Sequence, residues 1–356
     1  MDRSPQHEPS LAPAVLARSL WVERPGVAGL REAPLPAPGP GEVLVRTRFS
    51  GISRGTEGSV LMGRVPPEHA ARMRAPFQRG DLPGPVSYGY LAVGTVEAGP
   101  DDLRGRDVFV LHPHHDRFVV PVDAVHPLPG SVPARRAVLA GTVETALNVV
   151  WDAGVTLGDR VAVVGAGAVG AAVARLAARV PGTRVDLVDP QRQRAATASV
   201  LGVGYRHPDD LAGPGHVGGH DVVVHTSATA AGLALALRLA PDDGEVVEVS
   251  WFGTRSPAVP LGEDVHSRRV GIRPSQVGEV ARVRRDRRSR SDRLDLALRL
   301  LTDPAFDHLL GEDVRFEDLP RRLPGLLGVD GADDGADELA GHRGGDGRCA
   351  VVAYGA

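Results

Sequence analysis

Hydrophobic residues in the second half of the chain occur in short runs, which are separated by segments of helical spacing. Four of the runs predict buried strands, at residues 161–164, 185–188, 222–224 and 246–249. The segments between them predict helices, from residue 169 onward and over 192–201 and 232–240. Because strands that alternate with helices pair in parallel, this pattern predicts an α/β domain with a parallel sheet.

The first half of the chain has a different pattern. Residues 41–48 alternate apolar and polar side chains, which is typical of a half-buried strand. Short apolar runs follow at 93–96 and 108–111, among many Gly and Pro residues. We expect a small, irregular β-domain here, after about 30 Pro-rich residues without a clear pattern.

Four further segments lie outside these runs. Residues 134–151 and 294–301 have apolar positions at helical spacing and predict helices. The segment 330–348 is acidic and rich in Gly. The apolar run 350–354 predicts a last strand.

The amino-acid composition excludes several classes of enzyme. The length of 356 residues suits two domains. All 41 basic residues are Arg, which excludes Schiff-base enzymes, Walker A sites, and the short-chain and aldo-keto reductases that depend on a catalytic Lys. The one cysteine, Cys349, excludes a disulfide framework and a four-cysteine zinc site.

Charge and hydropathy bear on the partners and the cellular location of the protein. A formal net charge of -3 gives no reason to expect a nucleic-acid partner. Residues 1–13 are polar and do not resemble a signal peptide, and the uncharged run 161–174 is too short and Gly-rich to span a membrane. We expect a soluble, cytoplasmic protein.

The sharpest motif is the pattern Gly165, Gly167 and Gly170, which directly follows a predicted strand and opens a predicted helix. In that context the first glycine permits a tight turn, the second lets the backbone approach a pyrophosphate, and the third lets helix and strand pack closely. The helix N-terminus adds free N–H groups for the phosphates. The motif predicts a dinucleotide site.

The choice of dinucleotide depends on the next strand. It ends at Asp189, 19 residues after Gly170. A carboxylate there accepts hydrogen bonds from ribose hydroxyls and repels a 2′-phosphate, which favours NAD(H) over NADP(H). Arg192 and Arg194 follow closely and soften that exclusion.

A β-domain followed by a dinucleotide-binding unit resembles the medium-chain dehydrogenase/reductase superfamily over nearly the whole chain. The stretches that carry the resemblance are residues 41–45, 50–57, 86–96 and 105–110. Residues 50–57 and 249–253 also resemble the branch that includes the bacteriochlorophyllide a dehydrogenases, which oxidise a hydroxyethyl side chain with NAD.

This resemblance implies an α/β fold with two domains. A GroES-like, β-rich catalytic domain would comprise residues 1–125 and 281–356, and a Rossmann domain with a doubly wound parallel sheet would comprise residues 126–280. The resemblance also implies a homodimer and a small-molecule substrate, which the branch suggests is bulky.

The chain departs from the family at the catalytic zinc. The positions of the three metal ligands are occupied by Ser53, Tyr90 and Gly141, none of which is a good zinc ligand. Glu144 is the one nearby acid that would restore a metal site. We therefore expect a member without zinc.

Other positions match the family and carry over its cofactor contacts. Arg54 corresponds to a basic residue on the pyrophosphate, and Thr145 to a threonine at the nicotinamide. Ser227 and Ser250 follow strands of the parallel sheet, at the carboxyl edge where doubly wound folds bind ligands.

Without zinc, a side chain must transfer the proton that accompanies hydride transfer. The candidates, in falling order, are Tyr90, Ser53 and His114. His114 belongs to the cluster 112–116, which we interpret chiefly as a solvated turn, with an acid–base role or a metal site as alternatives. His225 follows a core strand and is as readily a structural histidine.

The seven arginines within residues 282–293 resemble a nucleic-acid patch, but we interpret them as a solvated helix face because Arg takes every basic position. The leading hypothesis is an NAD(H)-dependent oxidoreductase that interconverts an alcohol and a carbonyl. The alternatives are a zinc-free enoyl or quinone reductase that acts on C=C bonds, and an NAD(H)-binding protein without catalysis.

Overall fold

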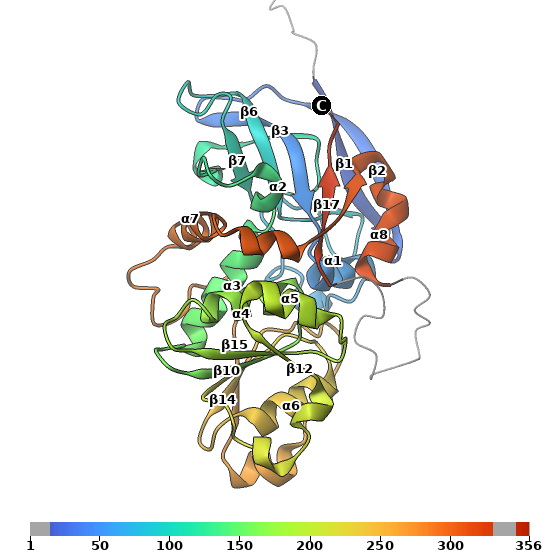
Figure 1. Cartoon of the computed structure of the whole chain (residues 1–356). Helices are drawn as coiled ribbons and strands as arrows, with labels where there is room; N and C mark the ends of the chain where they lie inside the picture. Colours follow the sequence, from blue (N-terminus) through green and yellow to red (C-terminus); the bar gives the residue numbers. More distant parts are fainter. Residues whose placement is uncertain (1–14, 330–346, 356) are drawn as a thin grey trace, which may run out of the picture.

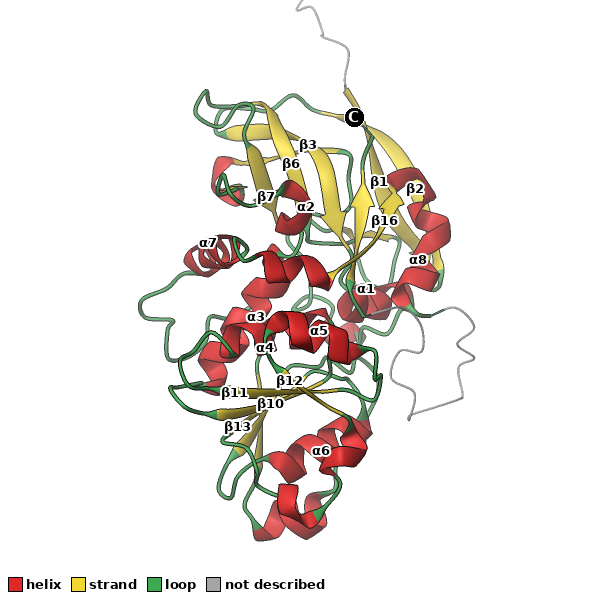
Figure 2. Cartoon of the chain, in the orientation of Figure 1, coloured by secondary structure: helices red, strands yellow, loops and turns green. Residues whose placement is uncertain are grey.

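The computed structural model describes residues 15–329 and 347–355 and has two parts, one above the other in Figure 1. The upper part consists mainly of antiparallel strands, and the lower part is a parallel sheet with helices on both faces (Figure 2). The fold is therefore α/β, as the sequence predicts, with a β-rich part and a Rossmann-like part. No helix in the described ranges is long and apolar enough to cross a bilayer.

The lower sheet has six strands in the order β12-β11-β10-β13-β14-β15, and all five pairings are parallel. In chain order they are β10 (Arg160–Val164), β11 (Arg184–Val188), β12 (Gly204–Arg206), β13 (Val222–His225), β14 (Glu245–Glu248) and β15 (Gly271–Pro274). The four predicted strands are confirmed. The edge strands β12 and β15 were not predicted, because they are short and mostly exposed and so have no apolar run.

Both faces of this sheet are covered by helices. The helices of this part are α3 (Ala140–Ala153), α4 (Ala168–Ala177), α5 (Arg194–Leu201) and α6 (Ala230–Leu239). Alternate residues of β10 point to opposite faces, as they must in a strand. Val161 and Val163 belong to the apolar core with α3 and α4, whereas Ala162 and Val164 belong to the core with α6.

The upper part contains two sheets. The larger has the order β16-β17-β3-β6-β7-β9 with β8 beside β3, and the smaller has the order β2-β1-β5-β4. Their strands are β1 (Val15–Arg24), β2 (Val27–Leu35), β3 (Glu42–Gly51), β4 (Arg79–Gly80), β5 (Val86–Ser87), β6 (Ala92–Ala98), β7 (Asp107–Val110), β8 (Arg117–Pro121), β9 (His126–Pro127), β16 (Leu310–Arg315) and β17 (Cys349–Ala353). The predicted last strand, β17, pairs with β3 and thereby returns the chain to its first sheet.

The remaining helices connect or flank these sheets. They are α1 (Arg54–Leu61), α2 (Ala134–Ala137), α7 (Arg290–Leu300) and α8 (Leu319–Leu327). Single helical turns lie at Pro67–His69, Val122–Ala124, Pro208–Leu211, Pro214–His216, Leu261–Val265, Pro304–Leu309 and Phe316–Asp318.

Two sequence expectations need correction, and a third is not tested by the structure. The helix expected over 134–151 is two helices, α2 and α3, with a break at Val138 and Leu139. The hairpin of β1 and β2 forms in a region for which no strand was expected. The expected acidic segment 330–348 lies outside the described residues except for its last two positions.

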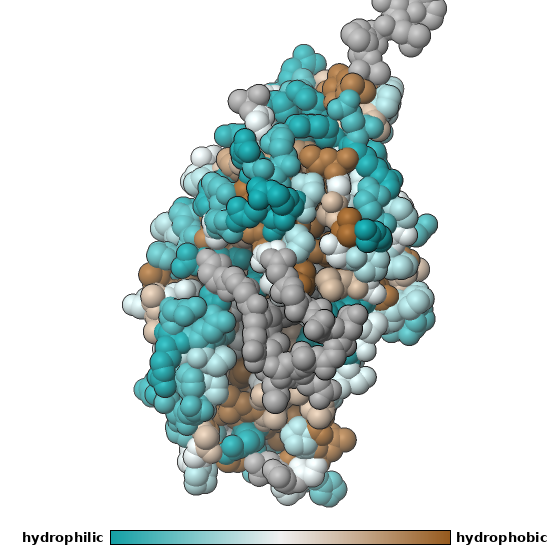
Figure 3. Space-filling model, turned by 90° about the vertical axis from the view of Figure 1, so that its right-hand side faces the viewer, coloured by the Kyte–Doolittle hydropathy of each residue, from teal (hydrophilic) through white to brown (hydrophobic). Residues whose placement is uncertain are grey.

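The surface has the mixed character of a globular protein. On the face shown in Figure 3, hydrophilic residues are interspersed with smaller apolar areas. Residues 282–288 are all exposed, as expected, but they form turns and not the expected helix, which begins only at Arg290. Arg293 is the exception within 282–293, because it is buried.

Arg293 joins α7 to α3 through a buried ion pair. Its side chain is 1% exposed, and Nη2 lies 2.9 Å from the Glu144 carboxylate. Nη1 donates to Asn148 Oδ1 at 2.6 Å and to the Glu279 carbonyl at 3.0 Å. A buried guanidinium with this many acceptors fixes the helix position, because its removal would leave the buried Glu144 carboxylate unpaired.

We predict that Arg293→Leu lowers the free energy of unfolding by about 3–5 kcal/mol, because it leaves the Glu144 carboxylate buried without its cation. Urea unfolding followed by circular dichroism measures the change. The matched control is Arg290→Leu, which removes an exposed ion pair to Glu279 on the same helix and should cost less than about 1 kcal/mol. Equal losses in the two variants would contradict this account of α7.

Candidate active site

A cavity of about 1500 Å³ lies between the two parts of the molecule. Its lower wall comprises the carboxyl ends of β10, β11, β13 and β14, and its upper wall includes the turn from β3 into α1. Pockets for single small ligands usually measure about 300–1000 Å³, so this one has room for a cofactor together with a substrate. Its position at the carboxyl edge of a parallel sheet is the usual ligand site of doubly wound folds.

The glycine motif has the predicted geometry. Gly165 has a φ of +114°, a conformation that other residues rarely adopt. A Cβ at Gly170 would lie 1.9 Å from the Gly165 carbonyl oxygen, so only glycine lets α4 approach the strand this closely. A Cβ at Gly167 would meet no atom closer than the Gly347 carbonyl oxygen at 3.9 Å. Space at Gly167 and contact at Gly170 fit a loop that receives a pyrophosphate.

Asp189 lies beside this loop and lines the cavity. Its Oδ2 accepts a hydrogen bond from the Ala166 N–H at 2.9 Å, and Oδ1 accepts one from the Gln191 N–H at 2.8 Å. The carboxylate therefore stabilises the glycine loop itself. Each carboxylate oxygen has a further lone pair, so both can still accept a hydrogen bond from a ribose hydroxyl.

From the sequence, Arg194 was expected only to soften the exclusion of NADP(H). It lines the same end of the cavity, at the start of α5, with 6% of its surface exposed. Within the described residues its Nε has no hydrogen-bond partner. A buried guanidinium with an unused donor attracts an anionic or hydroxyl group of a ligand, so Arg194 joins Asp189 as a candidate cofactor contact.

Ser227 and Ser250 lie at the cavity wall as expected, but both have partners within the protein. His225 links Glu248 to Ser227, with its Nδ1 2.6 Å from Glu248 Oε2 and its Nε2 2.6 Å from Ser227 Oγ. Ser250 Oγ accepts a hydrogen bond from the Ala228 N–H at 3.0 Å. His225 is fully buried in this chain of contacts and is a structural histidine that orients Ser227.

The upper wall brings Ser53 and Tyr90 together. The Tyr90 hydroxyl donates to Ser53 Oγ at 2.5 Å, and both residues line the cavity. Burial raises the pKa of Tyr90 to about 12, although hydrogen bonds with Ser53 and Thr56 oppose that shift. The phenol therefore stays protonated well above neutral pH, so its hydroxyl is available as a hydrogen-bond donor.

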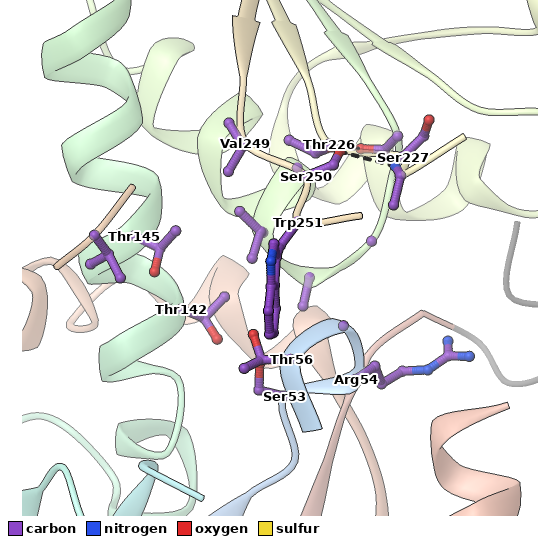
Figure 4. Close-up of a pocket in the computed structure, with 18 of the residues that line it drawn as sticks. Ser53, Arg54, Thr56, Thr142, Thr145, Thr226, Ser227, Val249, Ser250 and Trp251 are labelled. Atoms are coloured by element: carbon purple, nitrogen blue, oxygen red, sulfur yellow. Dashed lines mark hydrogen bonds between the residues drawn. The ribbon is translucent and has the colours of Figure 1, made fainter. Parts of the chain in front are cut away.

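Figure 4 shows how the other cavity residues are arranged. Ser53, Arg54 and Thr56 lie at the start of α1, opposite the sheet edge. Thr145 lies on α3, where its hydroxyl donates to the Gly141 carbonyl at 2.9 Å. The indole of Trp251, which follows β14, extends across the cavity toward Ser53 and Thr56. Trp251 belongs to the stretch 249–253 that carries the family resemblance, but it was not singled out there as a site residue, because the sequence does not show where its side chain points.

The third proton-transfer candidate, His114, is not at the cavity wall. It is 1% exposed, and its Nε2 lies 3.0 Å from Glu57 Oε2 while Nδ1 lies 2.7 Å from Ser50 Oγ. Glu57 Oε1 in turn accepts the Ser53 N–H at 2.8 Å. His114 therefore acts on Ser53 only through Glu57, by stabilising the turn that carries Ser53.

The interpretation of the histidine cluster as a solvated turn is wrong. His112, His114 and His115 are 3%, 1% and 2% exposed. His112 stacks on Phe118, with ring centroids 3.8 Å apart, and burial lowers the pKa of His112 to about 3. These histidine rings are buried within the β-rich part, because the segment that carries them is covered by its contact with β1.

The residues at the expected zinc position do not fit that metal. Ser53 and Tyr90 offer hydroxyl groups, and Gly141 offers no side chain, whereas zinc binds thiolate, imidazole or carboxylate. A side chain at Gly141 would also meet Leu91 Cδ2 at 2.6 Å. Glu144 is engaged by Arg293 and so is not a free ligand. Of the residues that the structure describes, no three His, Cys, Asp or Glu side chains are grouped closely enough to hold a metal ion.

Comparison with solved structures finds dehydrogenases that match almost the whole chain. A protein described as a zinc-binding dehydrogenase from Sinorhizobium meliloti 1021, bound to NADP, has a TM-score of 0.68 at 18% identity, over 95% of this chain and 99% of its own. The 2R,3R-butanediol dehydrogenase of Bacillus subtilis has a TM-score of 0.70 at 17% identity, with the same coverage of 95% and 99%. A protein described as a short chain alcohol dehydrogenase from E. coli CFT073, complexed with NADH, has a TM-score of 0.69 at 16% identity, again over 95% and 99%.

The chain therefore has the fold of these dehydrogenases. At these identities the likeness establishes the architecture, a GroES-like part with a Rossmann part. No protein-family model matches the sequence.

We predict opposite outcomes for alanine at two glycines of the loop. Gly170→Ala should destabilise the protein, because its Cβ would collide with the Gly165 carbonyl oxygen. Gly167→Ala should change the free energy of unfolding by less than about 1 kcal/mol, since its Cβ faces open space and only the N-cap preference changes. The same Gly167→Ala should nevertheless weaken NADH binding at least about tenfold, because the methyl group occupies the approach to the pyrophosphate.

Thermal unfolding and calorimetric titration with NADH measure the two effects. A Gly167→Ala protein that binds NADH like the parent would show that the cofactor does not lie against this loop.

Proposed function

We propose that the protein is an NAD(H)-dependent oxidoreductase of the medium-chain type, which interconverts an alcohol and a carbonyl without a catalytic zinc. The observation that carries this proposal is the composition of the cavity. A glycine loop fitted for a pyrophosphate and a pair of hydroxyls, Ser53 and Tyr90, line the same space. The fold shared with dehydrogenases supports the proposal.

When bound, the nicotinamide would supply the hydride chemistry. The protein would position the reactants and would supply a proton. Gly167 and the start of α4 would hold the pyrophosphate, with Arg54 as a further contact from the upper wall. Asp189 and Arg194 would hold the adenosine end, and Thr145 would lie at the nicotinamide.

Tyr90 is the first candidate for the proton. In the reducing direction its hydroxyl would donate to the oxygen of the carbonyl as that oxygen gains negative charge. Ser53 would then donate to the Tyr90 oxygen instead of accepting from it, and this reversal would stabilise the phenolate. The Glu57 carboxylate, through the Ser53 N–H, keeps Ser53 in place. By likeness to the family, we further propose a homodimer with a small-molecule substrate.

The first prediction concerns the choice of cofactor. NADH should bind at least about tenfold more tightly than NADPH, because Asp189 repels a 2′-phosphate. Asp189→Ala should narrow that difference, and Arg194→Ala should weaken the binding of both cofactors. Fluorescence titration of reduced cofactor measures these affinities, and equal affinities of the parent protein for NADH and NADPH would contradict the assignment.

The second prediction concerns catalysis without metal. Elemental analysis of protein purified without added metal should show far less than one zinc per chain, and turnover should survive dialysis against a strong chelator. Turnover is measured with a panel of alcohols and carbonyls by the near-ultraviolet absorbance of the reduced nicotinamide. Tyr90→Phe should lower kcat by about 10²–10⁴-fold and leave NADH affinity unchanged.

Three outcomes would count against parts of this proposal. A stoichiometric zinc that is lost in Glu144→Gln would overturn the zinc-free assignment. Reduction of enones or quinones with no alcohol product would assign the protein to C=C reduction. Tight NADH binding with no turnover of any compound would indicate that the protein binds NAD(H) without catalysing a reaction.

A further inference from the structure

One end of the cavity is covered by the chain itself. Gly347, which lies two residues before β17, lines the cavity together with Gly167 and with Ala168, the first residue of α4. Its carbonyl oxygen accepts the Ala168 N–H at 2.9 Å, and a Cβ at Gly167 would lie 3.9 Å from the same oxygen. The Gly347 carbonyl therefore occupies the part of the cavity to which the proposed function assigns the cofactor pyrophosphate.

The Ala168 N–H is one of the groups that a pyrophosphate would need. It belongs to the first turn of α4, and the first N–H groups of a helix have no acceptor within the helix itself. These free donors are the ones that bind phosphate groups in dinucleotide-binding folds. The N–H has one hydrogen, and the Gly347 carbonyl oxygen occupies the space in front of it, so Gly347 and a pyrophosphate exclude each other there.

Gly347 also covers a second group that is a candidate cofactor contact. A Cβ at Gly347 would lie 3.0 Å from Cζ of Arg194, so the guanidinium packs directly against the Gly347 backbone. Arg194 is 6% exposed, and its Nε has no hydrogen-bond partner among the residues that the structure describes. Departure of Gly347 would uncover this guanidinium and the Ala168 N–H together, and both are donors that suit a phosphate group.

The position of Gly347 in the chain allows its contact to be released. Its φ of +65° lies in the left-handed region, which glycine adopts without strain. The chain is fixed again at Ala350, whose carbonyl accepts the Ile52 N–H at 3.0 Å, and β17 pairs with β3 from there onward. Release of Gly347 therefore requires no break in the pairing of β17 with β3.

From these contacts we infer that Gly347 is an internal competitor of the cofactor: its carbonyl caps the glycine loop of the free protein, and dinucleotide binding must displace it. The inference rests on the proposed function, which supplies the pyrophosphate. The net free energy of one backbone hydrogen bond would leave about a tenth to a third of the molecules uncapped. The measured affinity for NADH would then be about three- to tenfold lower than the affinity of the uncapped loop.

The first measurement uses the unaltered full chain and NMR. In the free protein, the Ala168 N–H should show a nuclear Overhauser contact with the Cα protons of Gly347. Saturation with ADP-ribose, which carries the pyrophosphate without the nicotinamide, should remove that contact because Gly347 is displaced. This measurement needs no variant, so it decides the inference even if a substitution at Gly347 prevents folding.

The second measurement is calorimetric titration of Gly347→Ala with NADH and with ADP-ribose. The variant should bind both ligands about three- to tenfold more tightly than the parent, because alanine disfavours a positive φ and its Cβ would meet Arg194. An equal gain for the two ligands assigns the effect to the pyrophosphate. Amide hydrogen exchange at Ala168 in the free variant should be faster than in the parent by the same factor.

The matched control is Gly154→Ala. Gly154 has a φ of +66° at the end of α3, so alanine meets the same backbone strain there. It lies outside the cavity, and a Cβ at this position would have no atom within 4 Å. This variant should keep the parent affinity for both ligands.

The outcomes separate this inference from the proposed function. Unchanged or weaker binding of both ligands in Gly347→Ala overturns the inference, even if the protein reduces ketones. A contact between Ala168 and Gly347 that persists with ADP-ribose bound, or that is missing from the free protein, overturns it as well. Tighter binding of both ligands without turnover of any alcohol or carbonyl supports the inference and overturns the proposed dehydrogenase activity. If neither ligand binds to the parent or the variant, the inference and the proposed function are both wrong.

Discussion

The pairing of β17 with β3 is the contact on which the cavity depends. Val351 lies opposite Gly51, so the end of the chain returns to the β-rich part after the whole parallel sheet has been completed. This return also places Gly347 at the start of α4, where its carbonyl accepts the Ala168 N–H at 2.9 Å. The end of the chain therefore contacts both parts of the molecule, and the glycine loop and the turn that carries Ser53 line the same cavity.

Burial determines the chemistry of the upper wall. It keeps the Tyr90 phenol protonated, and it makes the contact of Glu57 with His114 and the Ser53 N–H hard to replace with water. The site has hydroxyls where the family resemblance places metal ligands. Behind the Ser53 turn, the Glu57 carboxylate accepts the Ser53 N–H and contacts His114, and these contacts hold the turn in place.

The elements with the strongest periodicity were predictable from sequence. The runs that became β10, β11, β13 and β14 are continuous and apolar because both faces of a parallel sheet are covered. The glycine motif was equally predictable from the sequence, because the collision of a Cβ at Gly170 with the Gly165 carbonyl is a local constraint. The hairpin of β1 and β2 was not predictable, because much of β2 is exposed and its Pro-rich surroundings resemble a loop.

The sequence by itself determined the parallel sheet, the dinucleotide loop and Asp189, because each depends on residues close together along the chain. Only the tertiary structure decided the environment of the others. It buried His114 against Glu57, occupied Glu144 with Arg293, and brought Trp251 into the cavity that Ser53 also lines. These contacts join segments that are far apart in sequence, and their burial depends on how the two parts of the molecule pack. No local pattern of residues records that packing.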